Sequence, residues 1–280
     1  MAEKKPLEKL NLLDRFLFAE AMEDPVIMAN TLEIILGREV VLDCLPQAEK
    51  EQRISTLKRF IKLDVWARDV EDVIYDTEVQ KRDTKNLPKR SRYYQALIDS
   101  KLLKPGEIDF NMLNKVYVII IMPFDLFGQG LYRYTFQMQC GEAPEIELGD
   151  GAVRIFLNTH GTNPEGVSQE LIDLLYYMEH TDQKTSAGCT SIKIRDMQER
   201  IEAIKSSEEV GVRYMQEWEE RELDKREARE LGRKDGQKEG ADRVNRLNRI
   251  LADRGRADDI IKAAVDKEYQ EKLFEELGVE

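Results

Sequence analysis

IKLDVWAR at residues 61–68 and VIYDTEVQ at residues 73–80 are two short segments in which apolar and polar residues alternate. Alternation with a period of two is typical of a β-strand that buries one face. All odd-numbered residues of the first segment are apolar, whereas the second alternates less cleanly. The short connection predicts an antiparallel hairpin that reverses at Glu71. Residues whose numbers sum to 142 should then lie opposite each other.

The polar face of this hairpin carries the candidate chemistry. In the predicted register Asp64 lies opposite Glu78, with about 5 Å between their Cβ atoms. Two carboxylates so close repel each other unless a cation lies between them, and Mg²⁺ prefers oxygen ligands of this kind. Gln80 projects from the same face and is placed to reach a metal-bound water. The alternative is an amphipathic hairpin whose polar face is simply solvated.

The surrounding segments predict an α/β fold in the order helix, three strands, helix, strand. Asp24 can cap a helix that starts at Pro25 and stops at Gly37. The run at residues 116–122 is apolar enough for a strand buried on both faces. The other predicted elements are a helix at 10–20, strands at 40–42, 61–68 and 73–80, a helix at 88–103, and a hairpin-like pair at 132–140 and 153–157.

The character of the chain changes after Ser168. A short apolar helix is predicted at 171–178, and the charge-dense stretch 192–239 predicts a long exposed helix, with a coiled coil as the alternative. An apolar row at the start of this stretch predicts self-association through it. The row consists of Ile192, Ile194, Met197, Ile201 and Ile204.

Three glycines recur every fourth residue in the charged stretch, and we call them the glycine row: Gly232, Gly236 and Gly240. They cost an isolated helix about 3 kcal/mol relative to alanine, so either the helix frays there or something packs closely on that face. Two amphipathic helices, at 244–254 and 258–277, follow and should need a partner surface.

Composition limits the classes of function. The chain has 280 residues, 41% of them hydrophobic, and a net charge of −12. Its longest apolar run, 116–124, is far shorter than the roughly 20 residues that cross a bilayer, so no membrane anchor is expected. The N-terminus lacks the apolar segment of a secretory signal, and three widely spaced cysteines fit a reducing compartment, so we expect a cytoplasmic protein.

A negative net charge argues against a protein coated by nucleic acid, so any phosphate partner must meet a local basic patch. Residues 81–92 provide one, with six basic residues and one acidic residue immediately after the candidate carboxylates. The predicted DNA-contacting residues are Lys81, Arg82, Lys89, Arg90 and Arg92.

The ordered set of motifs resembles a known family. Asp64, thirteen residues, and then Glu78-Val79-Gln80 on a strand is similar to the metal-binding motif of the PD-(D/E)XK nuclease superfamily, with glutamine where lysine is usual. The segments at 14–18, 87–94 with Asp99, and 116–122, and the charged, glycine-containing C-terminal helix, resemble the PD-(D/E)XK nuclease family transposases, also called recombination-promoting nucleases. The resemblance covers nearly the whole chain and is strongest over residues 10–125.

The resemblance implies a restriction-endonuclease-like αβββαβ core over residues 8–160, with a helical C-terminal extension over 168–280. It implies a Mg²⁺-dependent DNA endonuclease of recombination or transposition, with Mn²⁺ as a substitute ion. Asp64 and Glu78 would hold the metal with the backbone carbonyl of Val79, and Gln80 would take the place of the motif lysine. Glutamine brings no positive charge, so the metal would have to supply more of the transition-state stabilisation.

Two points stay open at the level of the sequence. The superfamily often adds an acidic residue from the first helix, and both Asp14 and Glu20 are available for this role. The alternative function is that of a nuclease-derived protein without activity, which acts as an interaction or oligomerisation module through its helical extension. That alternative predicts no Mg²⁺ binding.

Overall fold

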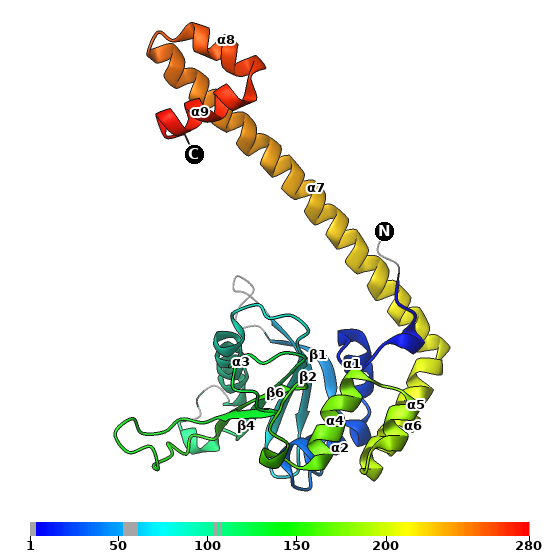
Figure 1. Ribbon diagram of the computed structural model, residues 1–280. Coiled ribbons are helices and arrows are strands. Elements are labelled where there is room, and N and C mark those ends of the chain that lie inside the picture. Colours follow the sequence, from blue (N-terminus) through cyan, green and yellow to red (C-terminus); the bar gives the residue numbers. More distant parts are fainter. Residues whose placement is uncertain (1–3, 53–60, 104–105, 107, 280) are drawn as a thin grey trace. The chain divides into compact units, whose positions relative to one another are not determined.

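The computed structural model describes residues 4–52, 61–103, 106 and 108–279, and the side chains of 49–52 and 61–64 lie outside the description. Its centre is a six-stranded mixed sheet in the order β1-β2-β3-β4-β6-β5 (Figure 1). The β1–β2, β2–β3 and β5–β6 pairs are antiparallel, and β3–β4 and β4–β6 are parallel. The strands are β1 (Gln47–Gln52), β2 (Ile61–Arg68), β3 (Ile74–Val79), β4 (Val116–Met122), β5 (Arg133–Phe136) and β6 (Ala152–Asn158).

The predicted hairpin and its register are confirmed. Partners from Val65↔Thr77 to Arg68↔Ile74 all have numbers that sum to 142. The reversal is fixed by the buried Asp69, whose carboxylate accepts hydrogen bonds from the backbone N–H groups of Glu71 and Val73, both at 2.9 Å. A carboxylate that satisfies two turn amides holds the chain reversal, and with it the register of both strands.

The predicted first strand is wrong. Residues 40–42 form only an isolated bridge, Leu42↔Asp69, and the strand at the edge of the sheet is β1, with the sequence QAEKEQ. β1 pairs along its length with β2, from Gln47↔Trp66 to Gln52↔Ile61. An edge strand held by backbone hydrogen bonds does not need an apolar face, so its polar sequence carries no alternating signal.

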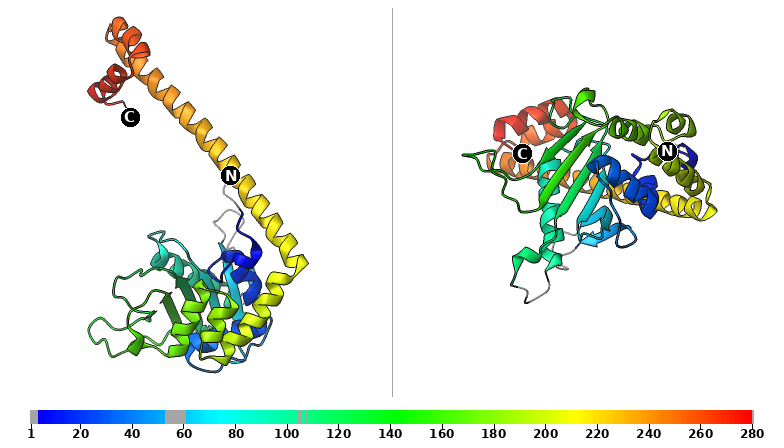
Figure 2. Two further views of the ribbon diagram at one scale, coloured as in Figure 1. Left: turned by 45° about the vertical axis from the view of Figure 1, so that its right-hand side comes forward. Right: turned by 90° about the horizontal axis from the view of Figure 1, so that it is seen from below.

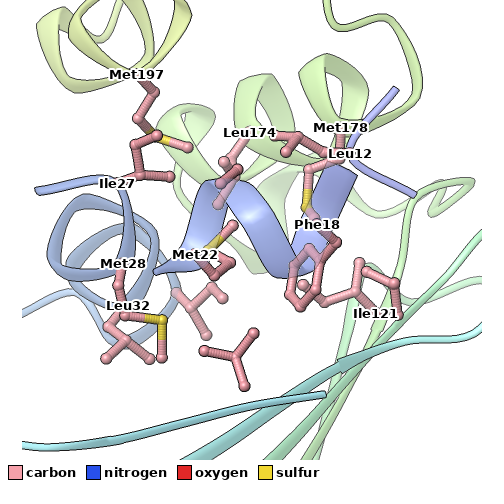
Figure 3. Packing of buried hydrophobic residues seen from close by; sticks show 14 of the residues in the cluster. Leu12, Phe18, Met22, Ile27, Met28, Leu32, Ile121, Leu174, Met178 and Met197 are labelled. Carbon is pink, nitrogen blue, oxygen red and sulfur yellow. The ribbon is translucent and has the colours of Figure 1, made fainter. Parts of the chain in front are cut away.

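One face of the sheet is covered by helices from both ends of the first 214 residues (Figures 1 and 2). α2 begins and ends as predicted, because Asp24 accepts hydrogen bonds from two N-terminal amides and Gly37 closes the helix with φ 68°. Figure 3 shows Leu12, Phe18, Met28 and Met178 in the core between these helices and Ile121 of β4. The helices are α1 (Arg15–Met22), α2 (Pro25–Leu36), α4 (Gln169–Glu179), α5 (Gln183–Gly188) and α6 (Ile192–Ser206).

The opposite face is covered by α3 (Leu87–Leu102). Leu87, Tyr94 and Leu97 of this helix are buried against a second apolar cluster, which includes Val118 and Ile120 of β4. The order helix, three strands, helix, strand is thus confirmed, and so is the predicted α/β class with its helical C-terminal extension.

Most of the apolar row predicted for self-association lies in this core, whereas Ile192 is exposed. Ile194, Met197 and Ile201 of α6 are fully buried, and α6 contacts α1 and α2. The chain divides by its contacts into two compact units, residues 1–214 and 215–280. The limits 8–160 and 168–280 stay a prediction about which parts carry the function.

The predicted long helix is interrupted once. α6 ends at Ser206, Ser207 is extended, and α7 (Glu208–Asp253) begins directly after it. The residues of the glycine row are helical and exposed, and a Cβ added at any of them would meet nothing within 4 Å among the described atoms. The row therefore neither interrupts the helix nor serves close packing within the described chain.

The second unit has a core of its own. α8 (Ala257–Val265) and α9 (Lys267–Leu277) replace the single helix predicted over 258–277, because the chain turns at Asp266. Leu247 and Leu251 of α7 pack with Leu273 and Phe274 of α9, so these helices bury their apolar faces on one another. The partner surface that these helices were expected to need is thus provided within the second unit. No helix within the described ranges is long and apolar enough to span a membrane.

Candidate nuclease site

The polar face of β3 lies under α3 and is closed to solvent. Asp76 is fully buried and Glu78 is 2% exposed, whereas Gln80, directly after the strand, is half-buried. The burial follows from the sheet, because even-numbered residues of β3 share a face with Val118 and Ile120 of β4, and α3 packs on that face. Asp76 and Glu78 are therefore not solvated, whereas on β2 Arg68 stays partly exposed and Asp64 lies outside the described side chains. Buried carboxylates are rare unless they are paired or bind metal ions.

Arg90 of α3 joins the end of β3 to the helix above it. Its Nη2 donates to Oε1 of Gln80 at 2.7 Å and lies 3.4 Å from Oε2 of Glu78. The Gln80 amide donates in turn to the carbonyl of Arg82 at 2.6 Å. The guanidinium carbon also lies 5.7 Å from the centre of the Tyr94 ring. Gln80 is therefore an acceptor for a cation at its carbonyl end.

The described strand pairs end one residue before the predicted pairing of Asp64 with Glu78. The Asp64 backbone belongs to β2, one residue before the pair Val65↔Thr77, and its side chain lies outside the described residues. Continuing the register by one residue sets its Cα opposite that of Glu78. The shared cation of Asp64 and Glu78 stays a prediction.

The two acidic candidates of the first helix have different partners. Both carboxylate oxygens of Glu20 accept hydrogen bonds from Arg213, at 3.0 and 2.6 Å, and this bonding raises the pKa of Arg213. Asp14 caps α1 and lies 3.3 Å from Nζ of Lys81, the residue after Gln80. Asp14 is thus linked to the end of β3, while Glu20 is bound to α7.

The predicted DNA-contacting residues separate into two groups. Arg90 points inward, and Lys81 is paired with Asp14. We call the other three the outer basic residues: Arg82, Lys89 and Arg92. They are exposed, and within the described part of the chain no carboxylate forms an ion pair with them. Their charges are available to a phosphate backbone, although DNA contact itself stays a prediction.

The family model of the PD-(D/E)XK nuclease family transposases matches residues 14–231. The chain belongs to this family. The resemblance inferred from the motifs is thus confirmed, and the match includes β1 to β6 and α1 to α6. No curated protein and no solved structure shows a significant match to the chain. Nucleases of the PD-(D/E)XK type generally depend on a divalent metal ion, and membership in the family implies a DNA substrate.

The side chains at the end of β3 fit a hard divalent ion by their chemistry. Asp76, Glu78 and Gln80 offer oxygen donors on one face, and Val79 adds a backbone carbonyl beside them. Mg²⁺ takes one or two carboxylates and keeps several waters, so it does not require a dense protein cage. Among the described side chains no three His, Cys, Asp or Glu residues form a metal-binding group.

Two features of the site were missed from the sequence. The alternation in residues 73–80 places Asp76 on the same face as Glu78, two residues away, yet its deep burial is not visible from the sequence. Arg90 was counted with the surface charges, yet it stands three residues after Leu87 and four before Tyr94, which are both buried. That spacing puts Arg90 on the inward face of α3, and it is the signal that could have revealed its direction.

Proposed function

We propose that the protein is a Mg²⁺-dependent DNA endonuclease that acts in recombination or transposition by hydrolysing phosphodiester bonds, with Mn²⁺ as a substitute ion. The observation that carries the proposal is the almost complete burial of Glu78, next to Arg90 and Gln80 and three residues before the basic segment 81–92. An acidic side chain excluded from water on a face that also presents polar partners is typical of a functional site rather than of a solvated strand.

The roles follow the motif residue by residue. Asp64, Glu78 and the Val79 carbonyl hold the metal, and Asp76 is a further carboxylate on the same face. When bound, the divalent ion polarises the scissile phosphate and makes a hydroxide nucleophile accessible at neutral pH. Gln80 helps to orient the attacking water. The outer basic residues hold the DNA backbone across the site.

We further propose a cytoplasmic location and self-association through α7. Most of the apolar row of α6 is already buried in the first unit, although Ile192 is exposed, so this association would mainly use exposed residues after Tyr214. Light scattering of the full chain over a range of concentrations measures the mass directly. A monomeric mass throughout would contradict the association without affecting the nuclease assignment.

The nuclease assignment is tested by cleavage of supercoiled plasmid with and without Mg²⁺. We expect nicked or linear DNA only with the metal, and loss of cleavage when Glu78 is replaced by glutamine. Glu71→Gln is the matched control, because Glu71 lies in the same hairpin, with its side chain 71% exposed at the turn. Absence of Mg²⁺-dependent cleavage in the parent would favour the interaction-module alternative.

A further inference from the structure

The proposed reaction needs a positive charge that the motif of this chain does not provide. Hydrolysis forms a bond from the water oxygen to phosphorus and breaks the bond to one ester oxygen, which receives the proton that water loses. Negative charge grows on the phosphoryl oxygens in between, and fixed cations stabilise it. Gln80 stands where the superfamily motif has lysine, and a neutral amide cannot supply this charge.

Arg90 lies where that charge is missing. Its guanidinium is fixed by three groups, namely the Gln80 amide oxygen at 2.7 Å, the Glu78 carboxylate at 3.4 Å and the Tyr94 ring. The side chain is 26% exposed, so it is held under α3 but still reaches solvent. A lysine at position 80 would repel this guanidinium, whereas the glutamine oxygen accepts a hydrogen bond from it. The glutamine and the arginine therefore complement each other.

We propose that Arg90 is a catalytic residue that gives the scissile phosphate the positive charge absent from position 80. The inference rests on the proposed nuclease activity and adds to it a residue from another element of the fold.

Donor capacity supports this role. A guanidinium has five N–H donors, and both contacts to Gln80 and Glu78 are made by Nη2. Nε is buried, so the donors left for a phosphate are those of Nη1, which makes no hydrogen bond within the described ranges of the chain. A fork with donors left over is suited to phosphate oxygens, which accept two parallel hydrogen bonds from arginine.

Two other roles would give different results. A simple phosphate contact, as expected for the outer basic residues, would affect DNA affinity and not the rate of the bound complex. A purely structural clamp on Glu78 would act through metal binding, because loss of Arg90 would misplace a metal ligand. The tests therefore measure the cleavage rate of bound DNA, at a protein concentration where DNA affinity does not limit it, and the Mg²⁺ affinity separately.

The main experiment is single-turnover plasmid cleavage by the full chain at saturating protein. Arg90→Ala should lower the rate by about 10²–10³-fold, as for removal of one stabilising donor in other enzymes. Moving the charge back to the motif position, in Gln80→Lys combined with Arg90→Ala, should give a cleavage rate at least about tenfold higher than that of Arg90→Ala alone. Lys101→Ala is the matched control, because it removes an exposed cation from the last turn of the same helix.

Calorimetric titration with Mg²⁺ and thermal melting by circular dichroism accompany the rates. Removal of the cation beside Glu78 should leave Mg²⁺ binding equal or a few-fold tighter, because like charges no longer compete. A folded Arg90→Ala variant that cleaves like an active parent would overturn the assignment of Arg90 alone. Loss of Mg²⁺ binding without rescue by lysine at position 80 would also overturn it, in favour of the clamp. An inactive parent would overturn this inference and the proposed function together.

Discussion

Replacement of Glu78 by glutamine separates chemistry from stability at one buried position. The substitution keeps the size of the side chain and its ability to accept a hydrogen bond from Arg90, and it removes one negative charge. The carboxylate oxygen of Glu78 lies 3.4 Å from Nη2 of Arg90. At an effective dielectric constant of 20, the lost attraction is about 5 kcal/mol.

Two effects offset this loss. Burying each ion of such a pair costs several kcal/mol, so the neutral side chain avoids a penalty of similar size. The stronger hydrogen bond of Arg90, at 2.7 Å to Gln80, is retained. We therefore expect the free energy of unfolding to change by no more than about 1–2 kcal/mol. For a unit of this size that corresponds to a melting shift of only a few degrees, at about 2–4 °C per kcal/mol.

Activity should respond very differently. A Mg²⁺ site with few protein ligands depends on anionic oxygens, and loss of one of them should reduce cleavage by about two orders of magnitude or more. The assay is plasmid cleavage across a Mg²⁺ titration, with melting followed by circular dichroism and Glu71→Gln as the control. A Glu78→Gln variant that cleaves like the parent would refute the metal-ligand role of Glu78.

Three further changes test other parts of the reasoning. Replacing all three outer basic residues by alanine should make the slope of log DNA-binding constant against log salt concentration shallower by about 2.7, at about 0.9 for each phosphate contact. Fluorescence anisotropy with labelled duplex DNA measures this slope, and an unchanged slope would mean that DNA binds elsewhere. Alanine at all three positions of the glycine row should stabilise α7 by up to about 3 kcal/mol, because no described atom would clash; urea unfolding followed at 222 nm would show no gain if an unseen partner packs there. Burial raises the pKa of Asp99, so ionisation of its carboxyl disfavours the folded state as pH rises through that pKa. The Asp99→Asn variant should therefore melt at a higher temperature than the parent at pH 7, and at the same temperature at pH 3, below the ordinary pKa of about 3.9. Equal melting temperatures at pH 7 would contradict the effect.

Regular sequence patterns predicted several elements of the fold correctly. The hairpin register, β4 and the limits of α2 followed from alternation, from an apolar run and from capping residues. β1 was missed, because a polar edge strand is defined by its backbone pairing, and this pairing does not require a recognisable pattern of side chains.

The helical period of apolar residues shows which face of a helix is apolar, but it does not show which surface packs on that face. The row of α6 fits a coiled coil as well as it fits the core of its own unit, and only the fold decides between them. The same holds for Glu78, because alternation assigned it to the polar face but could not reveal that α3 covers this face. The direction of Arg90 was concealed by the exposed charges next to it.

The burial of α6 against α1 and α2 has a consequence for synthesis of the chain. Every strand of the sheet leaves the ribosome before α6 does, yet the parts of α1 and α2 that contact α6 stay uncovered until residues 192–206 have followed. A nascent chain of 190 residues therefore carries all the proposed catalytic side chains on an incomplete core. We expect such a chain to be held by chaperones or to aggregate, so that the first unit completes its fold only when about three quarters of the chain has been made.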